Sequence, residues 1–177
     1  MNKTSVMRIG IVSDTHGHLD PRIAAFIEDC DIAVHAGDIM GQNVLEQLRP
    51  RSGQVVAVRG NNDIEQVWHA DEHPALDTIG HEASFEVPGG HIVVVHGHCH
   101  GGDHPQHDQL RESFPHARAI VYGHSHKMVC DLEASPWVMN PGAAGRIRTR
   151  GGPSCLLLEA SHDTWQVSEH RFPEQDI

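Results

Sequence analysis

Seven side chains that could bind metal ions occur in short polar segments, and each segment follows an apolar run. The seven are Asp14, His16, Asp38, Asn61, His96, His124 and His126. Oxygen and nitrogen ligands in this mixture suit divalent transition ions, whereas magnesium and calcium prefer nearly all oxygen. The residue types therefore predict a transition-metal site. Manganese is the favoured ion, with nickel, iron, cobalt or zinc as alternatives.

The number of candidate ligands predicts two divalent ions rather than one. If Asp38 bridges the two ions, each ion has four protein ligands, and open positions remain for water and substrate. Asp14 and His16 can reach the same ion if their segment is extended, because alternate residues of such a segment point the same way. Glycines that permit tight turns stand beside Asp38, Asn61, His96 and His124.

The apolar runs in the first half of the chain are predicted to be parallel strands. Residues 7–13, 32–36 and 55–58 are short apolar runs, and residues 21–28 and 43–48 between them have helical spacing. Strands that alternate with helices indicate an α/β arrangement, in which ligands bind beyond the carboxyl ends of the strands. Loops from five strands can therefore converge on one site.

The second half of the chain is predicted to be mainly β. Residues 83–87 and 91–95 flank the sequence PGG, as the two arms of a hairpin would. A short helix is predicted over residues 108–113. The remaining strands are predicted at 119–122, 128–131, 137–140, 154–159 and 165–170.

The ordered motifs resemble those of the calcineurin-like metallophosphoesterases. They are DTH at 14–16, GD at 37–38, GNND at 60–63, HGH at 96–98 and GHSH at 123–126. The small size and the NPG at 140–142 narrow the resemblance to the small bacterial and archaeal phosphodiesterase branch. The resemblance implies an α/β fold, a four-layer αββα sandwich of two mixed β-sheets flanked by helices. Residues 1–177 would form it as a single domain.

The resemblance also implies a ligand set and a reaction. It gives the first ion Asp14, His16, Asp38 and His126, and the second ion Asp38, Asn61, His96 and His124. A hydroxide that bridges the two ions would attack phosphorus in line, without a covalent phosphoenzyme. The expected activity is that of a binuclear metal-dependent phosphodiesterase acting on a small phosphoester substrate.

Four residues are candidates for a direct part in catalysis, namely Asp38, Asn61, Asn62 and His98. Larger family members have histidine at the position of Asn62, near the leaving group, and an asparagine cannot donate a proton as an imidazolium does. His98 can contact the phosphate or protonate the leaving oxygen, and the alternative is a solvated histidine. We therefore expect rates that depend steeply on the leaving group, and a preference for diesters over monoesters.

Other polar residues near the motifs are expected to have structural roles. Asn140 is expected to shape a turn beside the site, and Asp63 to brace the GNND loop by accepting hydrogen bonds from backbone amides. His100, His104 and His107 are expected to lie in a flexible surface loop.

Three arginines alternate along residues 146–150. They are Arg146, Arg148 and Arg150, separated by Ile147 and Thr149. Alternation of this kind predicts the solvated face of an edge strand. A contact with phosphate is the alternative.

Composition limits the classes of partner. Lys and Arg number 13 and Asp and Glu number 24, for a formal net charge of −11, which argues against general nucleic-acid binding. No apolar run could span a membrane, and the N-terminal MNKTSVMRIG lacks the apolar core of a signal peptide, so a cytoplasmic protein is expected. The sequence is compatible with the formation of an oligomer.

Two other functions compete with the enzyme. The first is a scaffold of the same fold that binds protein partners and has weak catalysis, as in a small retromer subunit of the superfamily. The intact ligand set argues against it. The second is a histidine-rich metal store built around residues 96–107, which would bind more than two ions. A P-loop or dinucleotide motif does not occur.

Overall fold

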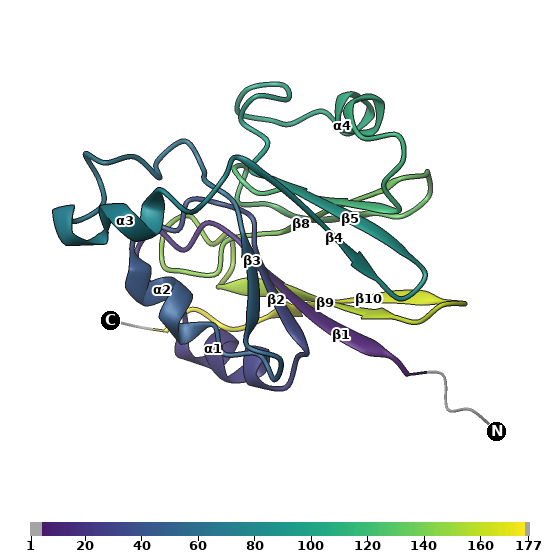
Figure 1. Cartoon of the computed structure of the whole chain (residues 1–177), viewed down its shortest axis with the longest axis horizontal. Coiled ribbons are helices and arrows are strands. Elements are labelled where there is room, and N and C mark those ends of the chain that lie inside the picture. Colours follow the sequence, from purple (N-terminus) through teal and green to yellow (C-terminus); the bar gives the residue numbers. More distant parts are fainter. Residues whose placement is uncertain (1–4, 176–177) are drawn as a thin grey trace.

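Two five-stranded mixed β-sheets pack face to face, with helices on the outer face of each, in the computed structural model (Figure 1). The structure describes residues 5–175. Residues 1–4, part of the N-terminal segment used to predict location, and residues 176–177 lie outside this description. Within residues 5–175, no helix is long and apolar enough to cross a membrane.

The first sheet has the order β10-β9-β1-β2-β3. Its parallel part consists of β1 (Met7–Val12), β2 (Ile32–His35) and β3 (Gln54–Ala57), connected by α1 (Pro21–Glu28) and α2 (Gln42–Gln47). The strands β9 (Ser154–Ala160) and β10 (Trp165–Arg171) add two antiparallel neighbours on the other side of β1.

The second sheet has the order β4-β5-β6-β8-β7. A hairpin of β4 (Glu82–Val87) and β5 (Gly90–Val95) forms one edge. The strand β5 then pairs in parallel with β6 (Ala119–Val121), and α4 (His107–Ser113) lies between these two strands in the sequence. The other edge is formed by β8 (Trp137–Pro141) and β7 (Met128–Asp131).

Alternation of side chains along buried strands produces the layers. Ile92 and Val94 of β5 face the core between the two sheets, whereas Val93 and Val95 face α4. A third core lies between the first sheet and the helices α1 and α2. Both faces of a covered sheet are apolar, which explains why β5 reads as a continuous apolar run rather than as an alternating pattern. The predicted αββα sandwich of two mixed sheets is confirmed.

Apart from the edge strand expected at residues 146–150, each predicted helix and strand is present, and its ends lie within one residue of the expected positions. Two short helices were not expected: the 3-10 helix η1 (Ala70–Glu72) and α3 (His73–Leu76). The only fully buried apolar side chain of α3 is Leu76. A single apolar contact gives a helix of this length no periodic pattern for recognition in the sequence.

The predicted edge strand over residues 146–150 is wrong. These residues form an irregular loop, and Arg148 and Arg150 have left-handed φ angles of 49° and 55°. A strand requires φ near −120° or below, so the alternation of arginines does not reflect a pleated segment.

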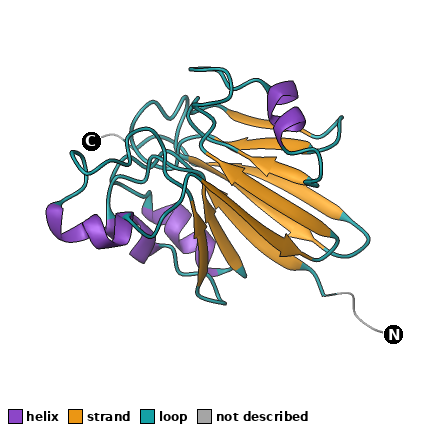
Figure 2. Cartoon of the chain, turned by 45° about the horizontal axis from the view of Figure 1, so that its top comes forward, coloured by secondary structure: helices purple, strands orange, loops and turns teal. Residues whose placement is uncertain are grey.

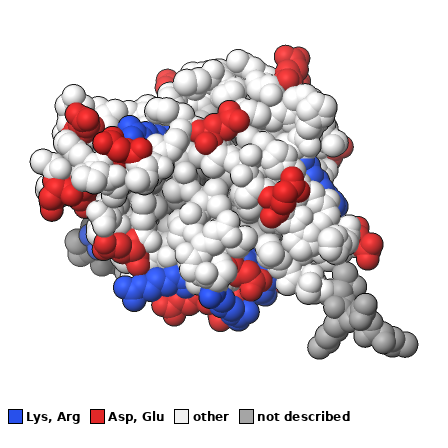
Figure 3. Space-filling view, in the orientation of Figure 1, with Lys and Arg blue, Asp and Glu red and all other residues white. Residues whose placement is uncertain are grey.

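The loops that carry the predicted ligands gather at one end of the two sheets (Figure 2). On the face drawn in Figure 3, acidic side chains are scattered and the basic ones lie mainly along the lower edge. This distribution agrees with the net charge of −11 and gives a nucleic-acid backbone little to bind on that face.

Asp63 fastens the loop after β2 to the loop after β3. Its buried carboxylate accepts hydrogen bonds from the backbone amides of Ile39 (3.1 Å), Met40 (2.8 Å) and Gly60 (2.8 Å). It also accepts one from the indole N–H of Trp68, at 3.0 Å. The predicted bracing role is confirmed, and it extends to the neighbouring loop.

We expect Asp63→Asn to lower the free energy of unfolding by about 2 to 4 kcal/mol, because an amide nitrogen would then face backbone N–H donors in a buried site. Urea unfolding of the metal-free protein measures the change. Asp163→Asn, at an exposed position, serves as the control and should change the value by less than about 0.5 kcal/mol. A loss no larger than that of the control would contradict this role.

His35 is a buried neutral imidazole at the end of β2. Its Nδ1 accepts from the N–H of Gly37 at 3.2 Å, so the proton is on Nε2, which donates to the Thr15 hydroxyl at 2.9 Å. Thr15 in turn donates to the carbonyl of Ile39 at 3.0 Å. Burial lowers the pKa of His35 to about 3. This chain of hydrogen bonds connects β2 with the loop after β1.

The lowered pKa of His35 predicts a loss of stability in acid. The unfolded chain binds a proton at this residue below about pH 6.5 and the folded protein does so only near pH 3. The contribution is therefore complete above pH 6.5 and decreases by up to about 1.4 kcal/mol per pH unit below it. In urea unfolding from pH 7.5 to 4.5, His35→Gln should flatten this slope, and His104→Gln, at an exposed position, should leave it unchanged. Equal slopes for the two variants would refute the assignment.

Candidate metal centre

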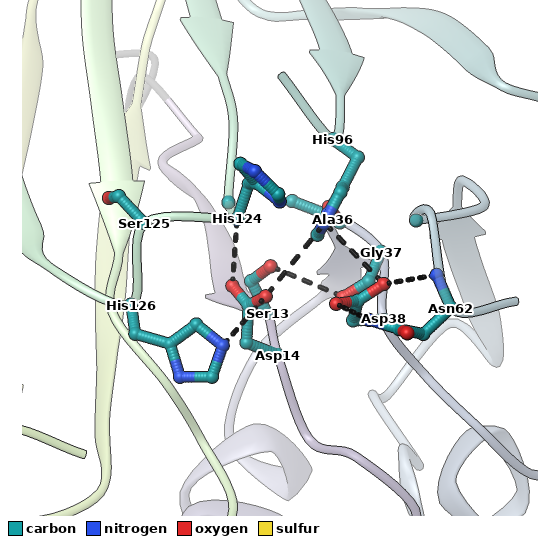
Figure 4. A network of polar contacts seen from close by, with 12 residues as sticks. Ser13, Asp14, Ala36, Gly37, Asp38, Asn62, His96, His124, Ser125 and His126 are labelled. Carbon is teal, nitrogen blue, oxygen red and sulfur yellow. Dashed lines mark hydrogen bonds and ion pairs between the residues drawn. The ribbon is translucent and has the colours of Figure 1, made fainter. Parts of the chain in front are cut away.

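Six of the seven predicted ligands lie together, and they come from the loops after four strands. Asp14 and His16 follow β1, Asp38 follows β2, Asn61 follows β3 and His96 follows β5. His124 and His126 follow β6. Side chains of these loops meet around the two carboxylates, as Figure 4 shows for Asp14, Asp38, His96, His124 and His126. The prediction that polar residues after separate strands share one site agrees with this arrangement.

The backbone at the site is not extended, which corrects the geometry expected for Asp14 and His16. Their φ angles are 52° and 46°, in the left-handed region, and Asp38 has a φ of 54°. The Asp14 N–H donates to the carbonyl of Gly37 and the His16 N–H to the carbonyl of Asp38, both at 3.0 Å. The two side chains converge because paired loops hold them in these turns. Left-handed non-glycine residues are uncommon and cluster at functional sites.

Two glycines permit the close approach of these loops. A Cβ on Gly60 would collide with the carboxylate of Asp38, and a Cβ on Gly123 would lie 2.8 Å from Oδ2 of Asp14. A larger residue at position 60 would displace the carboxylate of Asp38, and one at position 123 would first displace the hydroxyl of Ser13 and would crowd Asp14.

Asp14 is fully buried at the centre of the cluster. Its Oδ2 accepts from the N–H of His124 at 3.1 Å, and its Oδ1 lies 3.4 Å from Nε2 of His126 and 4.0 Å from Nε2 of His96. Oδ1 has no hydrogen-bond partner among the described residues. Burial raises the pKa of Asp14 to about 7, although His96 opposes the shift.

Asp38 is the second buried carboxylate. Asn62 donates to it twice, from its backbone N–H to Oδ1 at 3.0 Å and from its side-chain amide to Oδ2 at 2.9 Å. The Nε2 atoms of His96 and His16 each lie 3.5 Å from its oxygens. Burial alone would raise the pKa of Asp38, but the contact with His96 and the two bonds from Asn62 hold it below its usual range.

Backbone carbonyls fix the protonation of two histidines. Nδ1 of His96 lies 2.8 Å from the carbonyl of Ala36, and Nδ1 of His126 lies 2.9 Å from that of Ile147. A carbonyl only accepts, so each Nδ1 carries a proton and a neutral ring turns the lone pair of Nε2 toward the carboxylates. Nε2 of His126 also lies 3.1 Å from Nε2 of His16.

The lone pairs of these imidazole nitrogens and the carboxylate oxygens repel each other unless a cation lies between them. The buried atoms Oδ1 of Asp14 and Nε2 of His96 lack partners within the described chain, as expected where a cation would supply the missing contact. In the protein without metal, a proton on His96 can supply this positive charge. Burial lowers the pKa of His96, but Asp38 and Asp14 favour the protonated ring and raise the pKa overall. The donor set therefore fits divalent ions.

Two groups of three residues have ligand atoms within 4.8 Å of one another. They are Asp14, His16 and His126, and Asp14, Asp38 and His96. Asp14 belongs to both groups, whereas the resemblance makes Asp38 the shared ligand. The identity of the bridging carboxylate thus stays a prediction.

Two of the remaining predicted site residues, His124 and His98, lie beside His96. The ring of His124 is 5.1 Å from that of His96, and the ring of His98 is 5.5 Å from His96 and 6.1 Å from His124. Nδ1 of His98 is buried without a partner within the described chain. Asn61 is exposed, and Asn62 rather than Asn61 contacts Asp38.

Three other expectations have mixed outcomes. Asn140 shapes the turn as expected, since its Oδ1 accepts from the N–H of Gly142 at 2.9 Å. His104 is exposed. The surface-loop prediction is wrong for His107, whose Nδ1 lies 2.7 Å from Asp131 and whose Nε2 lies 2.8 Å from the Tyr122 hydroxyl.

Two residues at the site were not singled out as ligands or supports. His35 carries no local motif signal beyond its place at a strand end. Arg148 lies with Nη2 at 3.3 Å from Nε2 of His126, and its alternation with two other arginines favoured a different role. Both contacts join segments distant in the sequence, which no local pattern records.

Known proteins of similar sequence and fold agree with the motif analysis. The family model for the calcineurin-like phosphoesterase superfamily domain matches residues 7–163. The phosphodiesterase MJ0936 of Methanocaldococcus jannaschii is 29% identical over 147 residues, covering 77% of this chain and 83% of that protein. The predicted family resemblance is confirmed.

Solved structures show the same fold at low identity. A single-mutant Vps29 from Entamoeba histolytica has a TM-score of 0.72 and 17% identity, over 94% of this chain and 99% of that one. A structure described as a novel archaeal phosphodiesterase has a TM-score of 0.68 and 23% identity, over 93% and 100%. The motifs, the two-sheet fold and the family match over residues 7–163 together establish that this chain belongs to the calcineurin-like phosphoesterase superfamily.

Proposed function

We propose that this protein is a metal-dependent phosphodiesterase that binds two divalent ions between the loops after β1, β2, β3, β5 and β6. The observation that carries the proposal is the pair of buried, partnerless atoms, Oδ1 of Asp14 and Nε2 of His96, which face each other at 4.0 Å. The similarity to an archaeal phosphodiesterase supports the choice of reaction.

The chain's own residues position the reaction. When bound, two ions would activate water for attack on phosphorus and neutralise the charge of the phosphoryl group. The proposed ligands are Asp14, His16, Asp38, Asn61, His96, His124 and His126, with manganese as the favoured ion. The carbonyls of Ala36 and Ile147 aim the lone pairs of His96 and His126, and Asn62 orients both oxygens of Asp38. Such outer contacts fix ligand geometry and strengthen metal binding.

The leaving group would receive little help from Asn62. Its amide already donates to Asp38, and an amide does not release a proton at neutral pH. His98 is the nearer candidate for contact with the leaving oxygen or the phosphate, since it lies beside His96 and His124 with one ring nitrogen unpartnered within the described chain. We propose a small phosphodiester as the substrate.

A scaffold that binds protein partners is the second candidate. The likeness in fold to a Vps29 structure favours it, although at 17% identity that likeness concerns the fold alone. A panel of phosphodiesters and phosphomonoesters, assayed with metal content measured on the same sample, separates the two functions. Tight binding of two ions without turnover of any ester would favour the scaffold.

Replacing either buried carboxylate should remove metal and activity together. We expect Asp14→Asn and Asp38→Asn to lower diester hydrolysis by more than about 100-fold, because each removes charge and a ligand atom from the centre. Elemental analysis gives the metal content of the same samples. His104→Ala, at an exposed position, should keep both. Full activity in a chelated sample or in either variant would rule out the metal-dependent mechanism.

Rates should depend steeply on the pKa of the leaving group, because no general acid occupies the position of Asn62. A series of aryl diesters of rising phenol pKa measures the dependence in the wild type. Asn62→His should make the rate depend less steeply on the pKa of the leaving group if the new imidazole ring lies next to the leaving oxygen. Because Asn62 also holds Asp38, the metal content of this variant must be measured alongside the rates. A wild type that prefers monoesters, or that shows no dependence when chemistry limits the rate, would contradict the assignment.

A further inference from the structure

A guanidinium without a carboxylate partner lies against the proposed metal site. Nη2 of Arg148 donates toward Nε2 of His126 at 3.3 Å. Among residues 5–175, the ion pairs between basic and acidic side chains do not include Arg148. What distinguishes Arg148 from the other arginines without an acidic partner is its place, since its guanidinium contacts a predicted metal ligand.

The backbone on both sides of Arg148 is fastened. On one side, the carbonyl of Ile147 accepts from His126 at 2.9 Å. On the other, the carbonyl of Thr149 accepts from Arg171 at 2.9 Å, and the Thr149 hydroxyl donates to Glu174 at 3.0 Å. The loop therefore presents the side chain of Arg148 from a fixed position at the edge of the centre.

Arg148 opposes the binding of cations at the site it contacts. Its guanidinium lies 3.3 Å from Nε2 of His126, the nitrogen that would bind the ion. The positive charge of Arg148 therefore repels a divalent ion on the same nitrogen. An arginine in this place is therefore a poor support for the metal. It suits an anion that binds beside the metal, because a guanidinium can donate two parallel hydrogen bonds to phosphate oxygens.

We propose that Arg148 is a substrate-binding residue that donates to the non-bridging oxygens of the phosphoryl group. The proposal rests on the phosphoesterase function proposed above. When the site is loaded, the guanidinium leaves Nε2 of His126 and turns to the phosphate. The other two arginines of the loop differ, since Arg146 lines a separate cavity of about 420 Å³ that contains none of the predicted ligands. The side chain of Arg150 makes no polar contact within the described chain.

Calorimetry distinguishes a phosphate-binding role of Arg148 from a structural role in supporting His126. Metal-free wild type, Arg148→Gln, Arg148→Lys and Arg150→Gln are titrated with Mn²⁺, and the manganese-loaded proteins are then titrated with inorganic phosphate. Arg150→Gln is the matched control, because it removes the same charge from the same loop at a residue with a similar left-handed φ of 55°.

We expect Arg148→Gln to weaken phosphate binding by at least about tenfold, while Mn²⁺ affinity stays the same or rises. The phosphate affinity of Arg148→Lys should lie between those of wild type and Arg148→Gln, because an ammonium group lacks the planar pair of donors of a guanidinium. Arg150→Gln should stay within about twofold of wild type for both ligands. In diester assays, Arg148→Gln should raise KM by a similar factor.

Three results would overturn the proposal. They are phosphate affinity of Arg148→Gln within about twofold of wild type, an equal loss in Arg150→Gln, and a fall in Mn²⁺ affinity that parallels the fall for phosphate. The first excludes the contact, the second indicates long-range charge alone, and the third indicates support of His126. If phosphate binding responds as expected but wild type hydrolyses no ester, the proposed function is wrong and the phosphate contact holds.

Discussion

The rest of this structure depends on two carboxylates that are buried beside the lone pairs of imidazole rings. Asp14 and Asp38 are at most 2% exposed, and the neighbouring nitrogens of His96 and His126 are turned toward them by backbone carbonyls. Such an arrangement is unfavourable in a protein interior unless positive charge enters it. The interior of this domain is therefore built around a place for cations, and the surrounding contacts hold that place open.

The supporting contacts explain why the fold tolerates this centre. Asp63 ties the loops after β2 and β3 together through four N–H donors, and His35 with Thr15 ties β2 to the loop after β1. The strands behind these loops are parallel neighbours with apolar residues on both faces. Stability resides in the sheets and their three cores, and strain is confined to the turns at their ends.

The sequence predicted the sheets more completely than it predicted the site. Strands such as β5 are apolar on both faces and end at Gly or polar residues, so their type and ends are visible locally. The convergence of Asp14, Asp38 and His96 was also predictable, since each follows a strand. The left-handed turns at Asp14 and His16 were not, because they depend on hydrogen bonds to a neighbouring loop.

Contacts between distant segments account for the other differences. His107 meets Asp131 and Tyr122, and Arg148 meets His126, across separations of 15 to 24 residues. A pattern read along the chain placed His107 in a surface loop and Arg148 on an edge strand, because neither pairing leaves a periodic signal. The short helix at His73–Leu76 was missed for a related reason, since one buried leucine makes no repeat.

The hydrogen bond between His126 and the carbonyl of Ile147 has a consequence for how such a site can diversify. One short loop fixes the direction of a proposed metal ligand and also carries Arg148. An insertion or deletion there would rotate the imidazole as well as move the arginine, so the length of this loop is under a double constraint. The segment 99–106 carries none of the proposed ligands and none of the donors to Asp63, and it can vary in length and composition at lower cost. New substrate preferences are therefore expected to arise from that segment while the loop around Ile147 keeps its length.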